Sequence, residues 1–202
     1  MRSAGHVTGG QSLGAAGRSN PTPLSLVRSA GAIAAAVTTA VGLIALVVGA
    51  ALALQTRHWL HFPFTGLPAT PAEAGDIFLH NLRALVSVFS VLLIVQLPFW
   101  AGEDAEPGAA HRVLRGAAEL VLGAAVLANV TVVGVSLGAY GLRMIEDVAP
   151  QAPAELGAYA LALALYGKGR SRPLPRATVA TVGAVSVALL AVGALLETYV
   201  DL

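Results

Sequence analysis

The chain has 202 residues, of which 56% are hydrophobic and 11% are charged, against roughly a quarter charged in soluble domains. A mean hydropathy of +0.74 and several uninterrupted apolar runs place it among integral membrane proteins. The absence of cysteine excludes disulfides, thiolate metal sites and cysteine nucleophiles, and a net charge of +1 gives no indication of a nucleic-acid partner.

The N-terminal region, residues 1–29, is rich in Gly, Ser, Ala and Pro and carries arginines but no acidic residue. This composition predicts a disordered basic tail, followed by a transmembrane helical domain over residues 30–202. The first apolar run, Gly31–Leu54, is long enough to cross a bilayer. A cleavable signal peptide is the alternative, because A-L-A at 51–53 resembles a cleavage site, but the polar lead is too long for one.

A loop is predicted over residues 55–75, with the sequence R-H-W-L-H-F-P-F at 57–64. Its aromatic rings suit the boundary between bilayer and water. His58 and His61 have the spacing of a ligand pair, but no nearby carboxylate or third histidine completes a site. We therefore expect an interfacial aromatic loop and no metal.

The second apolar run, Ile77–Phe99, carries polar residues near its start. At 100° per residue, four of its polar side chains share one face: His80, Arg83, Ser87 and Ser90. Lipid cannot hydrogen-bond these groups, and a charge inside the membrane is costly unless it is paired or reaches the surface. The sequence predicts that this face meets protein or water.

Three further segments complete the predicted bundle. The third helix, Gly116–Gly141, contains Gly134-x-x-x-Gly138, which we expect to pack helices within the chain rather than between copies. The fourth, Ala154–Gly167, is too short to span about 30 Å of hydrocarbon unaided and is either a short crossing or a re-entrant arm. The last run is Ala177–Val200.

The distribution of Lys and Arg favours a crossing for the fourth segment. With five crossings, nine basic residues fall on the side of the N-terminus and three on the other side. If the fourth segment turned back, five would fall on the side of the N-terminus and seven on the other side. The positive-inside rule thus predicts an all-α polytopic bundle of about five transmembrane helices, the fourth short, with the N-terminus cytoplasmic and the C-terminus outside.

This topology brings charged residues of three helices to the outer side. We expect Arg83 to pair with Glu155 and/or Glu197, tuned by His80 and Asn81, because buried charges need partners. Glu119 lies near the cytoplasmic end of the third helix and is not expected to belong to this cluster. Three interpretations stay open: a clamp between helices, a docking or substrate site, and a catalytic or metal site.

The catalytic and metal interpretations are the weakest of the three. An arginine beside the carboxylates repels a metal cation, and no nucleophile–base motif occurs in the sequence. We therefore expect no enzyme activity, no catalytic residue and no cofactor.

Four sequence stretches together resemble the stage II sporulation protein M family of bacterial integral membrane proteins. The similarity covers roughly residue 35 to the end, and the family's Asn-x-Arg matches Asn81 and Arg83. In the family's His-Gly-x-x-Glu-Leu stretch, Glu155 matches, but Gln151 stands in place of the histidine and Ala152 in place of the glycine. The family's C-terminal glutamate matches Glu197. The four stretches are F-L-H-N-L-R at 78–83, A-N-V-T-V-V-G at 128–134, A-P-A-E-L-G-A at 152–158 and L-L-E-T-Y-V at 195–200.

The resemblance implies a location in the bacterial cytoplasmic membrane and a role as a scaffold that gathers cell-envelope enzymes. We expect a non-enzymatic scaffold or assembly factor with protein partners in the membrane or envelope, besides the lipid bilayer. The alternative is a subunit of a transporter or channel that uses the outer polar cluster as its substrate site.

Overall fold

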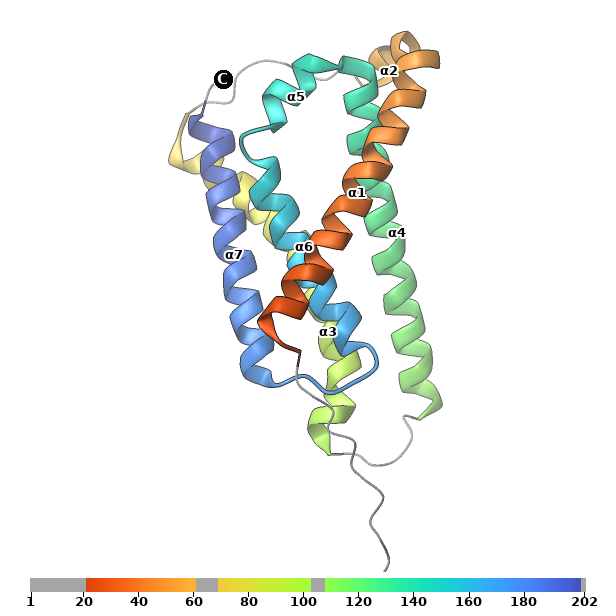
Figure 1. Ribbon diagram of the computed structural model, residues 1–202, viewed down its shortest axis with the longest axis vertical. Coiled ribbons are helices and arrows are strands. Elements are labelled where there is room, and N and C mark those ends of the chain that lie inside the picture. The colour runs from red at the N-terminus through yellow and green to blue at the C-terminus, as the bar shows by residue number, and fades with distance from the viewer. Residues whose placement is uncertain (1–20, 61–68, 103–107, 201–202) are drawn as a thin grey trace, which may run out of the picture.

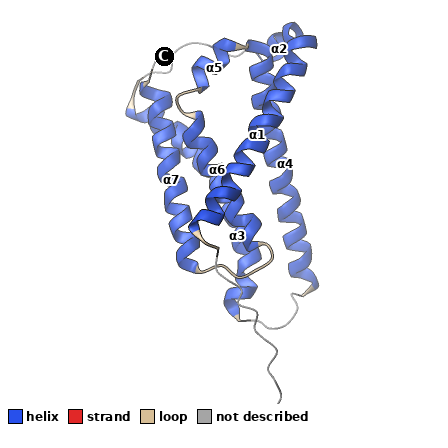
Figure 2. Ribbon diagram, viewed as in Figure 1, coloured by secondary structure: helices blue, strands red, loops and turns tan. Residues whose placement is uncertain are grey.

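The computed structural model describes residues 21–60, 69–102 and 108–200 (Figure 1). In these ranges the chain is helical almost throughout and contains no strand (Figure 2). The predicted all-α class is therefore confirmed. The helices are α1 Pro23–Ala51, α2 Ala53–Leu60, α3 Pro71–Ala101, α4 Ala109–Tyr140, α5 Leu142–Val148, α6 Ala152–Gly169 and α7 Arg176–Tyr199.

Helices α1, α3 and α4 begin earlier than the hydropathy pattern predicts, and α1 and α3 each have a threonine cap followed by proline in the first turn. The Thr22 side chain accepts a hydrogen bond from the Ser25 amide at 3.3 Å, and α1 begins inside the predicted tail 1–29. The Thr70 side chain accepts one from the Glu73 amide at 3.3 Å at the start of α3. Residues 1–20 of the predicted tail lie outside the described residues.

The short helix α2 covers the start of the loop predicted over 55–75, and the short helix α5 lies between the third and fourth predicted segments. Arg57 of α2 donates a hydrogen bond through Nε to the Ala139 carbonyl, and its guanidinium lies 5.9 Å from the centroid of the Tyr140 ring. These contacts dock α2 on the end of α4. Hydropathy alone missed both helices because neither is a long apolar run. The aromatic residues 62 and 64 and His61 lie outside the described residues.

Four helices of the described part are long and apolar enough to cross a membrane: α1, α3, α4 and α7. This is consistent with a multi-pass membrane protein. The fourth of the five predicted crossings corresponds to α6, which is not among these four. With 18 residues α6 is about 27 Å long at 1.5 Å per residue. The count of five is therefore not established by helix length and apolarity.

Helix α6 runs through the centre of the bundle, between α7 and α4 (Figure 1). Asn81 near the start of α3 hydrogen-bonds Glu155 in the first turn of α6, and Gln96 near the end of α3 hydrogen-bonds Gly169 at the end of α6. The two helices therefore run in the same direction, from what we name the Asn81 end to the Gln96 end. Closely spaced buried alanines show that α6 is enclosed on more than one side: Ala158, Ala160, Ala162 and Ala164.

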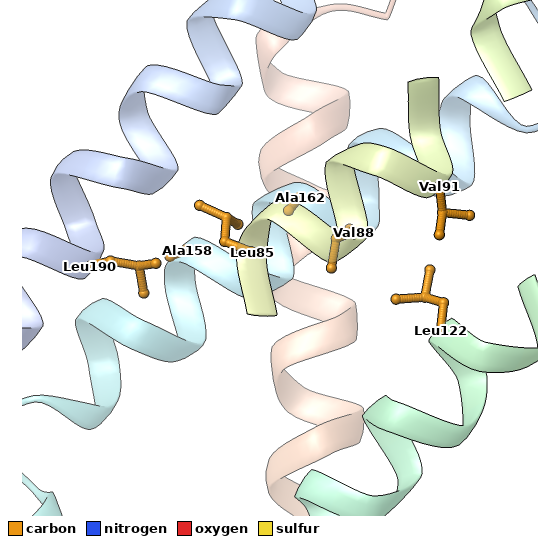
Figure 3. Close-up of a cluster of buried hydrophobic side chains, with 7 residues drawn as sticks. All are labelled: Leu85, Val88, Val91, Leu122, Ala158, Ala162 and Leu190. Carbon is orange, nitrogen blue, oxygen red and sulfur yellow. The ribbon is translucent and has the colours of Figure 1, made fainter. Parts of the chain in front are cut away.

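The central hydrophobic cluster joins α3, α4, α6 and α7 (Figure 3). Leu122 of α4 points toward Val91 of α3, while Leu85 of α3 lies over α6 (Figure 3). The small side chains of Ala158 and Ala162 allow the neighbouring helices to approach α6 closely.

Helices α1 and α4 pack through the predicted glycine motif. A Cβ atom at Gly138 would lie 2.6 Å from the Ala45 carbonyl oxygen, and one at Gly134 would lie 2.7 Å from the Cβ of Ile44. Only glycine fits at these two positions without a shift of the neighbouring helix. The prediction that this motif packs helices within the chain is confirmed.

Candidate functional site

Helices α3, α6 and α7 meet in a polar junction at the Asn81 end. The Asn81 side-chain amide donates to a Glu155 carboxylate oxygen, and the Tyr159 hydroxyl donates to the Asn81 carbonyl at 3.0 Å. Gly193 of α7 leaves the space that Glu155 occupies, since a Cβ there would lie 2.9 Å from Glu155 Cγ. Asn81 and Glu155 are half-buried, so this hydrogen bond is shielded from solvent on the side of the bundle.

Glu197 and His80 lie at the same end of the bundle. Glu197 is half-buried and within electrostatic reach of His80 and of the carboxylates of Glu73 and Asp147. Glu155 is in turn within reach of Glu197. Four of the five residues nominated from the sequence therefore gather here, contributed by three helices.

Arg83 does not join them. Its side chain is exposed, and within the described part of the chain it makes no hydrogen bond or ion pair, so the expected pairing with Glu155 and/or Glu197 is not what the structure contains. The reason is helical phase. Arg83 precedes the buried Leu85 by two residues, which places it about 160° away, on the opposite face of α3. Asn81 supplies the hydrogen bond to Glu155 instead.

We name the face formed by His80, Arg83, Ser87 and Ser90 the α3 polar stripe. All four side chains are exposed. The Ser87 and Ser90 hydroxyls donate to carbonyls of their own helix, at 3.0 Å to Arg83 and 2.8 Å to Val86. The stripe thus lies along the outside of this single chain rather than against another of its helices.

The Gln96 end holds a second polar junction, which the sequence analysis did not identify. The Gln96 side chain is completely buried; its amide donates to the carbonyls of Gly169 at 2.6 Å and Arg172 at 3.0 Å. Its oxygen accepts from the Leu174 amide at 2.7 Å. Trp100 Nε1 donates to the Leu174 carbonyl at 2.8 Å. These bonds fasten the loop between α6 and α7 to the end of α3. The available signal was one amide side chain inside the apolar run before Pro98.

An ion-pair cluster lies at the same end. Glu119 of α4 accepts hydrogen bonds from Arg115 Nε at 3.0 Å and from Arg170 Nη2 at 2.8 Å. Arg115 also donates to the Arg170 carbonyl at 3.1 Å, so α4 is tied to the end of α6. Glu119 stands apart from the Asn81 end, as predicted. The pairing of arginine with a glutamate, which was expected at the Asn81 end, is thus found at the Gln96 end.

Chemistry at these junctions is limited by the groups present. No group of three or more His, Asp or Glu side chains among the described residues could hold a metal ion. At the Asn81 end one amide bonds the Glu155 carboxylate and a phenol bonds the Asn81 carbonyl, and at the Gln96 end every charged or amide group described above has a partner. Both arrangements join helices, and neither presents a nucleophile beside a base.

The described part of the chain is an all-helical bundle whose four long apolar helices are consistent with a multi-pass membrane protein. Comparison with known protein families, with curated proteins and with solved structures gives no match.

Proposed function

We propose that the chain is a non-enzymatic membrane scaffold or assembly factor for cell-envelope machinery, as its resemblance to the stage II sporulation protein M family implies. The observation that carries the proposal is the α3 polar stripe, which exposes the Arg83 guanidinium with no carboxylate from the described residues beside it. A scaffold binds partners within the membrane, and such a stripe offers them a polar contact.

The proposed topology has five crossings in the bacterial cytoplasmic membrane, with the Gln96 end cytoplasmic and the Asn81 end outside. Its support is the path of α6 from one end of the bundle to the other, together with the excess of Lys and Arg on the side of the Gln96 end. A helix of about 27 Å is long enough for this crossing because α1, α3 and α7 surround much of it.

In this topology Arg83 lies inside the apolar region of α3. Roughly 10 Å of helix separates it from Asp76, the acidic residue at the start of that region. A cation on a lipid-facing surface costs up to about 3 kcal/mol at the membrane centre and less nearer the surface. A partner helix with a carboxylate or amide at this depth would remove that cost, since polar side chains join helices across a membrane.

Co-purification tests the scaffold function. The full chain is extracted from bacterial membranes in a mild detergent as wild type, Arg83→Gln and Arg28→Gln. Arg28 is the matched control, an exposed arginine on α1 that loses the same charge. We expect the same partner with wild type and Arg28→Gln, and at least about tenfold less with Arg83→Gln. Equal recovery with all three would contradict the proposal.

The second candidate, a transporter or channel subunit, is favoured by the hydrogen-bonded group of Asn81, Glu155 and Tyr159. Half-buried ionisable groups at membrane depth commonly mark substrate or ion paths. Flux into proteoliposomes that is abolished by Glu155→Gln but retained in Arg83→Gln would favour this candidate. Absence of flux beside an intact complex would favour the scaffold.

A further inference from the structure

A groove of about 460 Å³ opens on the side of the bundle between α1, α4 and α6. It exists because α1 and α4 touch through Gly134 and Gly138 near the Asn81 end and separate toward the Gln96 end (Figure 1). Small residues on facing helices, such as Ala36 and Gly123, keep it hollow. Along α4 the lining extends from Glu119 to Val130, roughly 16 Å at 1.5 Å per residue.

The groove is apolar along its length and polar at one end only. Leu163 and Val126 are typical of its walls, whereas Glu119 lies at its Gln96 end. Glu119 holds Arg115 and Arg170, whose side chains are 31% and 58% exposed. Two guanidinium groups against one carboxylate leave a net positive charge beside the end of an apolar groove.

We propose that this groove binds one acyl chain of an anionic phospholipid, with the lipid phosphate held by Arg115 and Arg170. In the proposed topology this end is cytoplasmic, where anionic lipids concentrate and where basic pockets between helices bind their headgroups. Glu119 lines the groove and holds both guanidinium groups, and a phosphate bound there would accept hydrogen bonds from their remaining N–H groups. The inference requires a chain embedded in a membrane and is independent of the scaffold function.

The groove suits a lipid acyl chain better than a second helix, which is about 10 Å in diameter and rigid. An acyl chain is narrower and flexible, and the volume lies within the range of about 300–1,000 Å³ typical of small-molecule sites. The polar end also matches a phosphate better than it matches an uncharged apolar molecule.

The test is a titration of the delipidated full chain in detergent, read by native mass spectrometry, with phosphatidylglycerol and phosphatidylcholine of equal chain length. Gly123→Leu fills the groove, where a Cβ meets no atom within 4 Å, and Gly116→Leu is the matched control on the same helix, equally open. Arg170→Gln removes one cation while Arg115 keeps its bond to Glu119.

We expect wild type and Gly116→Leu to bind phosphatidylglycerol about tenfold or more tightly than phosphatidylcholine. Gly123→Leu should lose that binding, and Arg170→Gln should lose the preference between the two lipids. Glycerol phosphate, which has no acyl chain, should not compete. Thermal unfolding of each variant checks its fold, and Ala36→Leu fills the groove from α1 if Gly123→Leu fails to fold.

Two results would overturn the proposal. One is equal binding of both lipids by wild type, which would indicate lipid around the bundle without a site. The other is unchanged phosphatidylglycerol binding by folded groove-filled variants. Competition by glycerol phosphate would instead assign the arginines to a free phosphate ligand and would contradict the role of the groove.

Discussion

The polar groups at the two ends of the bundle differ in the partners that they have within the chain. At the Gln96 end, Glu119 bonds both Arg115 and Arg170, and Gln96 satisfies three backbone groups of one loop. At the Asn81 end, Glu155 has a neutral donor, and the nearest arginine along α3 is on the outer face. At the first end, these polar groups therefore have their partners within the chain. The second leaves the Arg83 guanidinium exposed on the outside of the chain.

A charge in an apolar helix is therefore not evidence for a partner within the same chain. Glu119 and Arg83 both lie in long apolar helices, but only Glu119 turns toward a neighbouring helix that carries an opposite charge. Helical phase decides which of the two becomes a structural clamp. Substitutions at each end test this contrast.

The largest effect is expected for Gln96→Leu. The variant leaves the Leu174 amide and the Gly169 and Arg172 carbonyls without their partner in a buried place. Unsatisfied buried groups cost about 1–3 kcal/mol each, so we expect a loss of about 3 kcal/mol in the free energy of unfolding. Unfolding in detergent followed by circular dichroism measures it, with the exposed Gln55→Leu as control. A loss below that of the control would show that the hydrogen bonds of Gln96 do not stabilise this end of the bundle.

Asn81→Leu should cost somewhat less, about 2 kcal/mol, because the half-buried Glu155 carboxylate loses its donor. Asn129→Leu is the matched control, since the exposed Asn129 amide bonds only the Ala125 carbonyl of its own helix, at 2.9 Å. The same unfolding measurement applies. Similar losses for both variants would argue that Asn81 does not join α3 to α6.

Glu119→Gln should cost about 1 kcal/mol, the upper range for ion pairs with exposed members, since the Arg115 and Arg170 side chains reach solvent. The stability of wild type should fall as salt rises, and that of Glu119→Gln should change less. Identical salt responses would show that the ion pairs do not stabilise the Gln96 end.

The smallest effect on stability is expected for Arg83→Gln, within about 0.5 kcal/mol, because Arg83 is exposed and bonds nothing among the described residues. A loss comparable to that of Gln96→Leu would mean that Arg83 is a clamp within the chain. If the two ends differ as described, Arg83→Gln should keep its stability and should fail to co-purify the partner.

Hydropathy and charge predicted much of this fold. The long apolar runs appear as α1, α3, α4 and α7, and Gly134 and Gly138 pack α4 on α1 as expected. Helix starts at Thr22 and Thr70 were missed because capping, not hydropathy, determines them.

The site was predictable only in part. Asn81, Glu155 and Glu197 could be assigned to one end, since their places along successive helices determine their depth. Which neighbour each side chain meets depends on the rotation of every helix about its axis, and spacing within one helix does not provide that. The junction around Gln96 depends on a loop whose path has no apolar or charged pattern.

The most direct test of the central claim is photo-cross-linking from the α3 polar stripe in living bacterial membranes. A photoreactive phenylalanine analogue replaces Ser87 of the stripe or, as control, Leu120, an exposed residue of α4 at 73%. We predict a discrete protein adduct from position 87 and none from position 120. Lipid adducts alone from both positions would contradict the claim that the outward face of α3 binds a partner.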